Sequence, residues 1–476
     1  MTAAMPSSVA VIGGGITGLT AAFYLQKAGI SVTLYEASDR AGGVIRSVSQ
    51  DGYLAEWGPN TILETSPKIS QLVRDVGLLG RRLDPAPGSE ARYLVRNKRP
   101  VEMPGSPLGF LTTPLFSFGA KLAVLKEPFV PPRRDHVEES IAEFVSRRLG
   151  REFLDHAIDA MVAGVYAGEP ARLSVQQAFP KLAALEKTYG SLIKGQILGG
   201  RERRKRGEIS KDRAPKFSFD EGLQVLPDTL RARLGDAVRL STAVTAIRKI
   251  PEGWSVESST GGMVSSTKHR AVIHAGTAHG LAKLRLTIDG SSSDAGRDLD
   301  LSPFAEIRHP AVASVVLGFR REDVAFPCSG FGALIPRVEG FGILGTIFSS
   351  SLFPNRAPAG YLTLTSYVGG ERNPAFGSLP SEELVELTRR DLGILFGVKG
   401  APTFRHVAHY PKAIPQYNIG YGRHRDRLTT IEREAPALFF AGHYRDGISL
   451  GDSIVSGINI AERVELSLKS VESSDA

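Results

Sequence analysis

The chain lacks two features that would place it in a class at once. It has a single cysteine in 476 residues, Cys328, which excludes an internal disulfide and a metal site built from several cysteines. It also has no run of about 18 apolar residues uninterrupted by charged or polar ones, so we expect no membrane-spanning helix. Apolar strand residues begin at Val9, which leaves no room for a signal peptide, and we therefore expect a cytoplasmic location.

The composition is that of a globular protein with several domains. Hydrophobic residues make up 42% and charged residues 23%, which excludes disordered and fibrous chains. The 58 Lys and Arg against 50 Asp and Glu leave a net charge of +8. Part of this charge lies in residues 201–216, which lack the interleaved aromatic residues of a nucleic-acid site. We interpret that stretch as a solvated loop and expect no nucleic-acid partner.

The N-terminal segment has the pattern strand, glycine-rich turn, helix, strand. Residues 9–12 form an apolar run, residues 13–18 are rich in glycine, and residues 31–36 form a second strand-like run. This order predicts a βαβ unit and a doubly wound parallel sheet. Further strand-like segments at 238–247, 254–256, 271–276 and 437–442 indicate that distant segments complete the same domain. Residues 105–198 look mainly helical, and 310–370 look like an antiparallel sheet.

The glycine turn has the spacing of a dinucleotide-binding motif. Gly13, Gly15 and Gly18 form G-x-G-x-x-G between the first strand and the helix, and Glu36 ends the next strand. Glycines let the backbone approach a pyrophosphate, and the helix N-terminus favours its negative charge. A carboxylate at Glu36 can accept hydrogen bonds from a ribose but repels a 2′-phosphate, which disfavours NADP. NAD and a flavin both remain open at this point.

Two further segments decide between these cofactors. After Glu36 the chain reads E-x-x-x-R-x-G-G with Arg40, Gly42 and Gly43, and residues 440–451 contain a second glycine-rich block before a helix. Both segments resemble those of the FAD-dependent amine oxidase superfamily, and the resemblance implies FAD. It implies FAD-binding roles for Gly13, Gly15, Ile16, Thr17, Gly18, Glu36, Ala37, Arg40, Gly42, Gly43, Gly58, Pro59, Asn60, Val244, Gly442, His443, Ser449 and Leu450.

Within that superfamily nearly the whole chain resembles the oxygen-dependent protoporphyrinogen oxidases. The most specific stretches are residues 57–60, 92–93, 164–168, 219–224, 330–336, 345–350 and 414–418. The resemblance implies a fold of three parts. These are a Rossmann-like FAD-binding domain (1–87, 215–290, 413–470), a mixed-sheet substrate domain (88–104, 199–214, 291–412) and a helical membrane-binding domain (105–198).

The same resemblance implies a substrate site. Arg92 matches an arginine that pairs with a substrate propionate, as suits a bidentate guanidinium. Leu334 and Ile347 match an aliphatic pair around one pyrrole ring, and Tyr367 matches an aromatic stacking position. Two positions are implied near the reacting centre, Gly164 beside the methylene bridge and Asn60 beside the flavin.

Three of these positions depart from the family pattern. At the positions of Ile347, Tyr367 and His443, the family usually has Leu, Phe and Asn. The first two nearly preserve shape, and a buried tyrosine hydroxyl will need a polar partner.

The implied reaction is the six-electron oxidation of protoporphyrinogen IX to protoporphyrin IX. It consists of three hydride transfers to FAD, with O₂ as acceptor and H₂O₂ as product. The sequence contains no metal-ligand cluster, and no residue stands out as a general base. The resemblance further implies a homodimer and ferrochelatase as partners.

Several alternatives remain open. Oxidation of coproporphyrinogen III would place four propionates in the site, for which Arg96, Lys98 and Arg99 offer further positive charge. More distant alternatives for the function are an amine oxidase, a carotenoid desaturase and a non-catalytic flavoprotein. Residues 108–126 are apolar with flanking lysines, and by themselves they fit either a helical core hairpin or a surface that lies on a membrane. The resemblance implies a membrane-facing domain here, so we expect peripheral association with a membrane.

Overall fold

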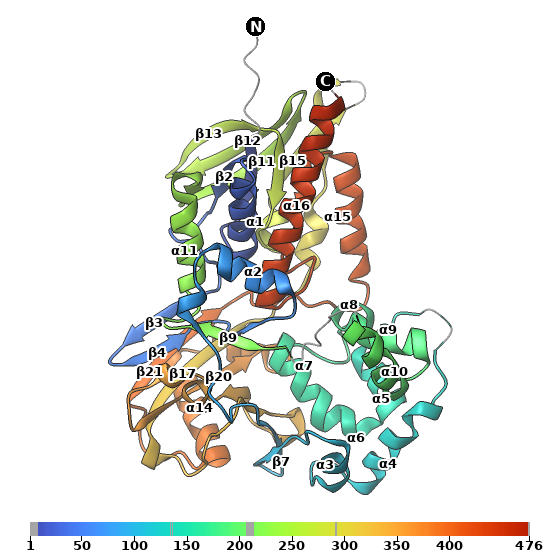
Figure 1. Cartoon of the computed structure of the whole chain (residues 1–476), viewed down its shortest axis with the longest axis vertical. Helices are drawn as coiled ribbons and strands as arrows, with labels where there is room; N and C mark the ends of the chain where they lie inside the picture. Colours follow the sequence, from blue (N-terminus) through green and yellow to red (C-terminus); the bar gives the residue numbers. More distant parts are fainter. Residues whose placement is uncertain (1–7, 134, 136, 206–213, 291–292, 475–476) are drawn as a thin grey trace.

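The computed structural model describes residues 8–133, 135, 137–205, 214–290 and 293–474. Figure 1 shows one large body above two smaller ones. The upper body contains a parallel sheet with long helices, the lower left contains a second large sheet, and the lower right contains a group of helices. Helix α16 descends from the top of the view, so its N-terminal end lies where the three parts meet.

The parallel sheet of the upper body is assembled from distant segments, as the strand pattern predicts. Its order is β10 (Val238–Arg239), β2 (Ser31–Tyr35), β1 (Ser8–Ile12), β14 (Ala271–His274) and β22 (Leu438–Phe440). One face packs on α1 (Ile16–Lys27), α2 (Pro67–Asp75), α11 (Val225–Leu234) and α16 (Leu450–Ser474). Val9 and Val11 of β1 are completely buried on this face.

The expectation of a doubly wound sheet is wrong for the other face. A second sheet covers most of it, in the order β13 (Met263–His269), β12 (Gly253–Thr260), β11 (Thr242–Ile250), β15 (Arg285–Gly290) and β16 (Ser293–Leu299). Helices α12 (Ala278–Leu281) and α15 (Gly422–Glu434) pack on the same face of the parallel sheet, beside this second sheet. Trp254 is buried in this layer, and its indole N–H donates a 3.2 Å hydrogen bond to the carbonyl of Pro436. The buried apolar residues of β12, Trp254 and Val256, alternate with less buried ones and therefore suit a half-buried sheet rather than a helix.

The lower left of Figure 1 contains a mixed sheet, as expected for residues 310–370 and their neighbours. Its order is β21 (Phe404–Tyr410), β17 (Val312–Arg320), β20 (Tyr361–Gly369), β19 (Ile343–Ile347), β18 (Gly332–Leu334), β7 (Arg92–Arg96) and β8 (Arg99–Glu102). Only the β7–β18 pair is parallel among these. Helix α14 (Ser381–Phe396) covers one face, and residues 157–167 pack against part of the other face.

Short elements connect these layers. The hairpin β3 (Ser47–Gln50) and β4 (Tyr53–Glu56) leads into the loop that carries Gly58 and Asn60. A small sheet joins β5 (Ile62–Leu63), β9 (Lys216–Phe219) and β6 (Arg82–Leu83), and α13 (Ser349–Leu352) follows β19.

Residues 105–198 are helical, as predicted. The helices are α3 (Pro107–Thr112), α4 (Phe118–Lys126), α5 (Ile141–Leu149), α6 (Arg151–Phe153), α7 (Asp159–Tyr166), α8 (Val175–Ala178), α9 (Pro180–Tyr189) and α10 (Leu192–Lys205), with a π-helical turn at Leu154–Ile158. Helix α10 includes residues 201–205, so the predicted loop is wrong there, while 206–213 lie outside the described residues. No helix within the described ranges has the length and apolar character that a membrane span requires.

Candidate active site

The glycine-rich turn forms a close-packed backbone cradle at the start of α1. A Cβ atom on Gly18 would lie 2.0 Å from the carbonyl oxygen of Gly13, whereas one on Gly15 would meet nothing within 4 Å. Gly15 is the N-cap residue and offers no side-chain cap, and no acidic residue lies in the first turn of α1. The first N–H groups of the helix therefore face open space with the charge that suits a phosphate. These residues fit the diphosphate of FAD.

Glu36 lies beside this cradle, at the end of β2. The backbone N–H of Gly14 donates to its carboxylate at 2.6 Å, and the N–H and hydroxyl of Ser38 donate at 2.8 Å. The N–H of Thr242 donates to the Glu36 carbonyl at 2.8 Å, which brings β11 and Val244 to the same edge. The carboxylate is thus held in place beside the turn, where it could receive a ribose.

The loop after Glu36 folds back over the glycine turn. The N–H of Gly42 donates to the carbonyl of Gly14 at 2.8 Å, and a Cβ on Gly43 would lie 3.4 Å from the Cα of Gly15. The guanidinium of Arg40 donates to the carbonyls of Ala41, Ile45 and Gly43 within its own loop. Arg40 therefore organises the loop that covers the cradle, and Ala37 begins it.

The C-terminal block packs against the N-terminal motif. The hydroxyl of Thr17 in α1 donates a 3.0 Å hydrogen bond to the carbonyl of Ser453 in α16, 436 residues away. The N–H of Gly442 donates to the hydroxyl of Ser456 at 2.9 Å, and Ser449 caps α16 by accepting from Asp452 N–H at 3.1 Å. The two sequence segments that imply FAD therefore lie at one place.

The loop after β4 joins this region to the substrate sheet. The side-chain amide of Asn60 donates to the Tyr367 hydroxyl at 2.7 Å, and that hydroxyl donates to the Gly58 carbonyl at 3.0 Å. Among the described residues, the buried Trp57 indole N–H and the buried Nε2 of His443 have no hydrogen-bond partner. Unpaired polar atoms of this kind are costly, and they suit a region that receives a polar ring system. We call the space between the glycine turn, this loop and His443 the flavin chamber.

The first row of substrate-site residues crosses the strands β7, β18 and β19. Arg92 lies opposite Gly332, and Gly332 lies opposite Ile347. Directly paired residues project to the same face of a sheet, so Arg92 and Ile347 share a face across the intervening glycine. Arg92 is half-buried and takes part in further contacts.

The second row lies two residues along the same strands. Leu334 lies opposite Gly345, and Gly345 lies opposite Tyr367. Residues two apart on a strand share a face, so the four predicted substrate residues line one face of the sheet. Burial raises the pKa of the Tyr367 hydroxyl, which therefore remains protonated and can donate at neutral pH.

Gly164 lies directly against this face. A Cβ atom on Gly164 would lie 2.4 Å from Cδ2 of Leu334, so no larger residue fits without a shift. Helix α7, which carries Gly164, is fixed at its start by Asp159. The guanidinium of the buried Arg372 donates to the Asp159 carboxylate at 2.8 Å, and the N–H of Arg337 donates to it at 2.7 Å.

The sequence reasoning missed the Asp159–Arg372 pair. Its one local signal is a charged residue at the start of the otherwise apolar residues 159–166, and its partner lies 213 residues away. No pattern within a window of the chain joins the two.

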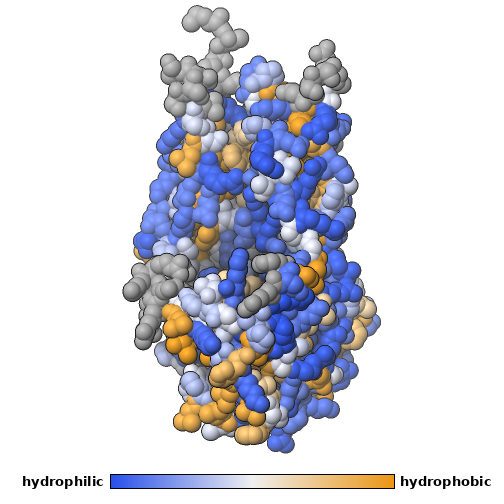
Figure 2. All heavy atoms as spheres, turned by 90° about the vertical axis from the view of Figure 1, so that its right-hand side faces the viewer, coloured by the Kyte–Doolittle hydropathy of each residue, from blue (hydrophilic) through white to orange (hydrophobic). Residues whose placement is uncertain are grey.

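The helical region has an apolar outer surface. Phe118, Phe129 and Leu108 are 82%, 84% and 72% exposed, whereas Leu115 and Phe116 are buried. Figure 2 shows apolar side chains gathered over the lower part of this side of the molecule. The segment 108–126 is thus partly a core hairpin and partly an exposed apolar surface. We call the exposed set the apolar surface: Leu108, Leu111, Phe118, Leu122, Leu125 and Phe129.

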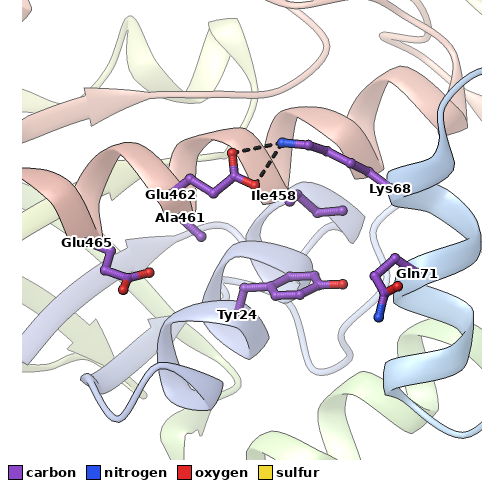
Figure 3. Close-up of a pocket in the computed structure, with 7 residues that line it drawn as sticks. All are labelled: Tyr24, Lys68, Gln71, Ile458, Ala461, Glu462 and Glu465. Atoms are coloured by element: carbon purple, nitrogen blue, oxygen red, sulfur yellow. Dashed lines mark hydrogen bonds and ion pairs between the residues drawn. The ribbon is translucent and has the colours of Figure 1, made fainter. Parts of the chain in front are cut away.

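Another hollow lies away from these residues. Figure 3 shows a shallow groove between α1, α2 and α16, lined by Tyr24, Lys68, Gln71, Ile458, Ala461, Glu462 and Glu465. The ammonium of Lys68 bonds Glu462 at 2.8 Å across it. None of the predicted site residues lines this groove. In the part of the chain that the structure describes, no group of three or more His, Cys, Asp or Glu is placed to hold a metal ion.

Comparison with known proteins agrees with this geometry. Residues 16–465 match the family described as flavin containing amine oxidoreductase. Protoporphyrinogen oxidase 2 of Arabidopsis thaliana is 34% identical over 480 residues, which cover 96% of this chain and 93% of that protein. Coproporphyrinogen III oxidase of Bacillus subtilis (strain 168) is 29% identical, over 94% of this chain and 96% of that protein.

The fold agrees as well. A crystal structure of a protein from Exiguobacterium sp. 255-15 superimposes with a TM-score of 0.79 at 21% identity, and the match covers 97% of this chain and 99% of that one. The family match begins within the first helix and includes the loop after Glu36, the substrate sheet and the C-terminal glycine-rich block. The chain belongs to the flavin containing amine oxidoreductase family, whose cofactor is FAD.

Proposed function

We propose that the protein oxidises protoporphyrinogen IX to protoporphyrin IX with bound FAD and O₂. The observation that carries this proposal is the shared face of Arg92, Leu334, Ile347 and Tyr367, closed by Gly164. A face of mostly apolar side chains with a cation in one row suits a large apolar tetrapyrrole with propionates at one edge. A small amine would need neither this extended apolar face nor Arg92.

In this proposal the chain mainly binds and orients the substrate. The chemistry that FAD supplies when bound is the acceptance of a hydride from carbon and the transfer of its electrons to O₂. Arg92 pairs with a propionate, and Leu334 and Ile347 hold one pyrrole ring between them. Gly164 lets the backbone of α7 approach the bridging carbon. Three rounds remove three hydrides and three protons and reduce three O₂ to three H₂O₂.

The alternative substrate is coproporphyrinogen III, which carries four propionates. Of the additional basic groups, Arg96 is bonded to Glu152 at 3.2 Å, and Lys98 and Arg99 are exposed at the β7–β8 turn. Arg96 shares the face of Arg92 but lies further along β7, whereas Arg92 lies in the same row as Ile347. This arrangement favours the substrate with two propionates.

The test is a direct comparison of the two substrates. The purified protein should have the visible spectrum of bound flavin, and its turnover is then followed by porphyrin fluorescence with each porphyrinogen. We expect a higher kcat/KM with protoporphyrinogen IX. Higher kcat/KM with coproporphyrinogen III would assign the alternative, and no turnover of either would refute the proposal.

We also propose that the apolar surface associates with membranes from one side. Phe118 and Phe129 are among its most exposed members, and Lys126 follows Leu125 at the end of α4. Aromatic and aliphatic side chains beside lysines suit the headgroup boundary of a bilayer. Wild type should sediment with phosphatidylglycerol vesicles, and Phe118→Ser/Phe129→Ser should remain in the supernatant. Equal sedimentation of both proteins would refute this part.

A further inference from the structure

Three neighbouring histidines form a row that begins at His443 of the flavin chamber. His279 lies in α12, His309 lies just before β17, and His443 follows β22. The ring centres of His279 and His309 are 5.4 Å apart, and those of His309 and His443 are 6.4 Å apart. Both pairs of rings are nearly perpendicular, at 89° and 81°. Three segments far apart in the sequence therefore place three imidazole rings next to one another.

The two ends of the row lie in different surroundings. His443 follows Gly442, and a Cβ on Gly442 would lie 3.7 Å from the hydroxyl of Thr17 in the glycine turn. His279 and His309 line a cleft of about 310 Å³ that opens to solvent. The row thus connects the flavin chamber with the outside.

Each histidine has a buried nitrogen without a hydrogen-bond partner among the described residues. These atoms are Nδ1 of His279 and Nε2 of both His309 and His443. The Nδ1 of His309 lies 2.8 Å from the Ile307 carbonyl, so Nδ1 carries the proton and Nε2 is the basic atom.

Burial and nearby positive charges keep the imidazoles of the row neutral. Burial, with His309 and His279 nearby, lowers the pKa of His443 to about 4, and burial likewise lowers that of His309 to about 4. Burial and two facing lysines, Lys412 and Lys283, lower the pKa of His279. The remaining charges on the cleft wall, Arg308 and Glu371, neutralise each other through hydrogen bonds of 2.9 and 3.0 Å. Neutral imidazoles can each accept one proton and release it again.

We propose that His443, His309 and His279 form a proton path between the flavin chamber and the solvent-facing cleft. This inference rests on the proposed function for its purpose. Each round of oxidation takes a hydride from a methylene carbon and frees one proton. Over three rounds, two of these protons come from pyrrole N–H groups and one comes from the fourth methylene carbon. Reduction of O₂ to H₂O₂ uses the two electrons and the hydrogen of that hydride and needs one further proton. The substrate half of each round thus releases one proton and the O₂ half takes one up, so the round is balanced, and the row exchanges each proton with solvent.

The test uses the FAD-bound protein and the variant His309→Phe, which keeps a planar ring and removes the central basic atom. The matched control is His409→Phe, because His409 is exposed on β21 and lies outside the row. The first readout is the exchange of the His443 ring N–H with solvent, measured by NMR on histidine-labelled protein. We expect exchange about tenfold slower in His309→Phe and unchanged in His409→Phe.

The second readout is reoxidation of photochemically reduced flavin by O₂, which needs no porphyrinogen. We expect it about tenfold slower in His309→Phe, with loss of the solvent deuterium effect, and also slower in His309→Gly, in which the vacated space lets added imidazole restore the rate. FAD content must equal that of wild type. Wild-type rates in both readouts, or slowing in His309→Gly that imidazole does not restore, would overturn the proton path. Failure of porphyrinogen turnover in the wild type would instead refute the proposed function and leave these two readouts intact.

Discussion

The amide of Asn60 donates a 2.7 Å hydrogen bond to the hydroxyl of Tyr367, and this bond joins the flavin chamber to the substrate sheet. Asn60 follows β4, whereas Tyr367 lies on β20, 307 residues later. The same hydroxyl donates to the Gly58 carbonyl at 3.0 Å. One tyrosine oxygen thus fixes the distance between the loop beside the flavin and the face that holds the substrate.

Replacing Tyr367 by Phe should cost stability more than turnover. The ring that faces the substrate is retained, but the Asn60 amide and the Gly58 carbonyl both lose a partner, at about 1–2 kcal/mol of unfolding free energy. We expect a lower thermal midpoint for the FAD-bound protein and a kcat within about twofold of wild type. Asn60→Leu, which removes the amide and keeps the tyrosine, serves as the matched variant. A kcat that falls steeply in Tyr367→Phe would contradict this division of roles.

Adding one methyl group at Gly164 should abolish most of the activity. The new Cβ would lie 2.4 Å from Cδ2 of Leu334, and overpacking of this kind costs about 1–3 kcal/mol. We expect Gly164→Ala to lower kcat/KM about tenfold or more, since 1.4 kcal/mol corresponds to a factor of ten. The double variant Gly164→Ala/Leu334→Ala removes the clash and should recover part of the loss. Additive losses in the double variant would show that the two residues do not meet.

Arg92→Ala should weaken porphyrinogen binding without loss of FAD. A hydrogen-bonded charge pair contributes about 1.5–3 kcal/mol, so we expect KM to rise about 10- to 100-fold. Arg92→Lys keeps the charge but not the two parallel N–H donors, so its KM should lie between those of wild type and Arg92→Ala. Arg99→Ala is the control, because Arg99 is exposed at the β7–β8 turn. An unchanged KM in Arg92→Ala would remove Arg92 from the site.

The sequence predicts the flavin region well because its determinants are local. Gly13 has a positive φ, a Cβ on Gly18 would clash with the Gly13 carbonyl, and Gly15 leaves open space before the helix. Glu36 directly follows the adjacent strand. The resemblance also names Arg92 and Tyr367. Their common face depends on the register of the intervening strands, which the sequence alone does not reveal.

Long-range packing accounts for what the sequence did not predict. The sheet that covers the second face of the parallel sheet, around Trp254, has the same alternating pattern that any half-buried sheet has. The residues 201–205 are strongly charged but continue α10, since a helix can extend beyond its packed part. The row of His279, His309 and His443 comes from three separate segments, and dispersed histidines carry no signal in sequence.

Glu36→Gln should weaken FAD binding about tenfold or more, the equivalent of about 1.4 kcal/mol. The carboxylate accepts from Gly14 N–H at 2.6 Å and from Ser38, and a glutamine would place its own N–H₂ against one of these donors. It would also lose the negative charge that favours ribose hydroxyls. Titration of the FAD-free protein with FAD, followed by flavin fluorescence, measures the change. Ser38→Ala removes one donor to Glu36 and should leave FAD affinity nearly unchanged.

Glu127→Gln should destabilise the helical region in a pH-dependent way. The carboxylate is fully buried and accepts from Arg148, from the Ser191 hydroxyl at 2.6 Å and from the N–H groups of Leu192 and Ile193 at 2.8 and 3.1 Å. Burial opposes its ionisation, but these hydrogen bonds outweigh burial and hold the pKa of Glu127 below its ordinary value of 4.5. The variant leaves Arg148 with Glu186, which also pairs with Arg147, as its remaining counter-charge, and breaking a buried pair in this way costs about 3–5 kcal/mol at neutral pH.

Because the pKa is lowered in the folded state, the stabilisation by Glu127 is complete above pH 4.5 and is lost as the pH falls through the folded value. The stability difference between wild type and Glu127→Gln should therefore be largest at pH 7 and shrink below pH 4. Amide exchange at Leu192, at the start of α10, gives a local measure of this difference. Glu127→Leu/Arg148→Met removes both charges and should recover much of the loss. A difference that does not change with pH would show that the Glu127 carboxylate contributes by its shape rather than by its charge.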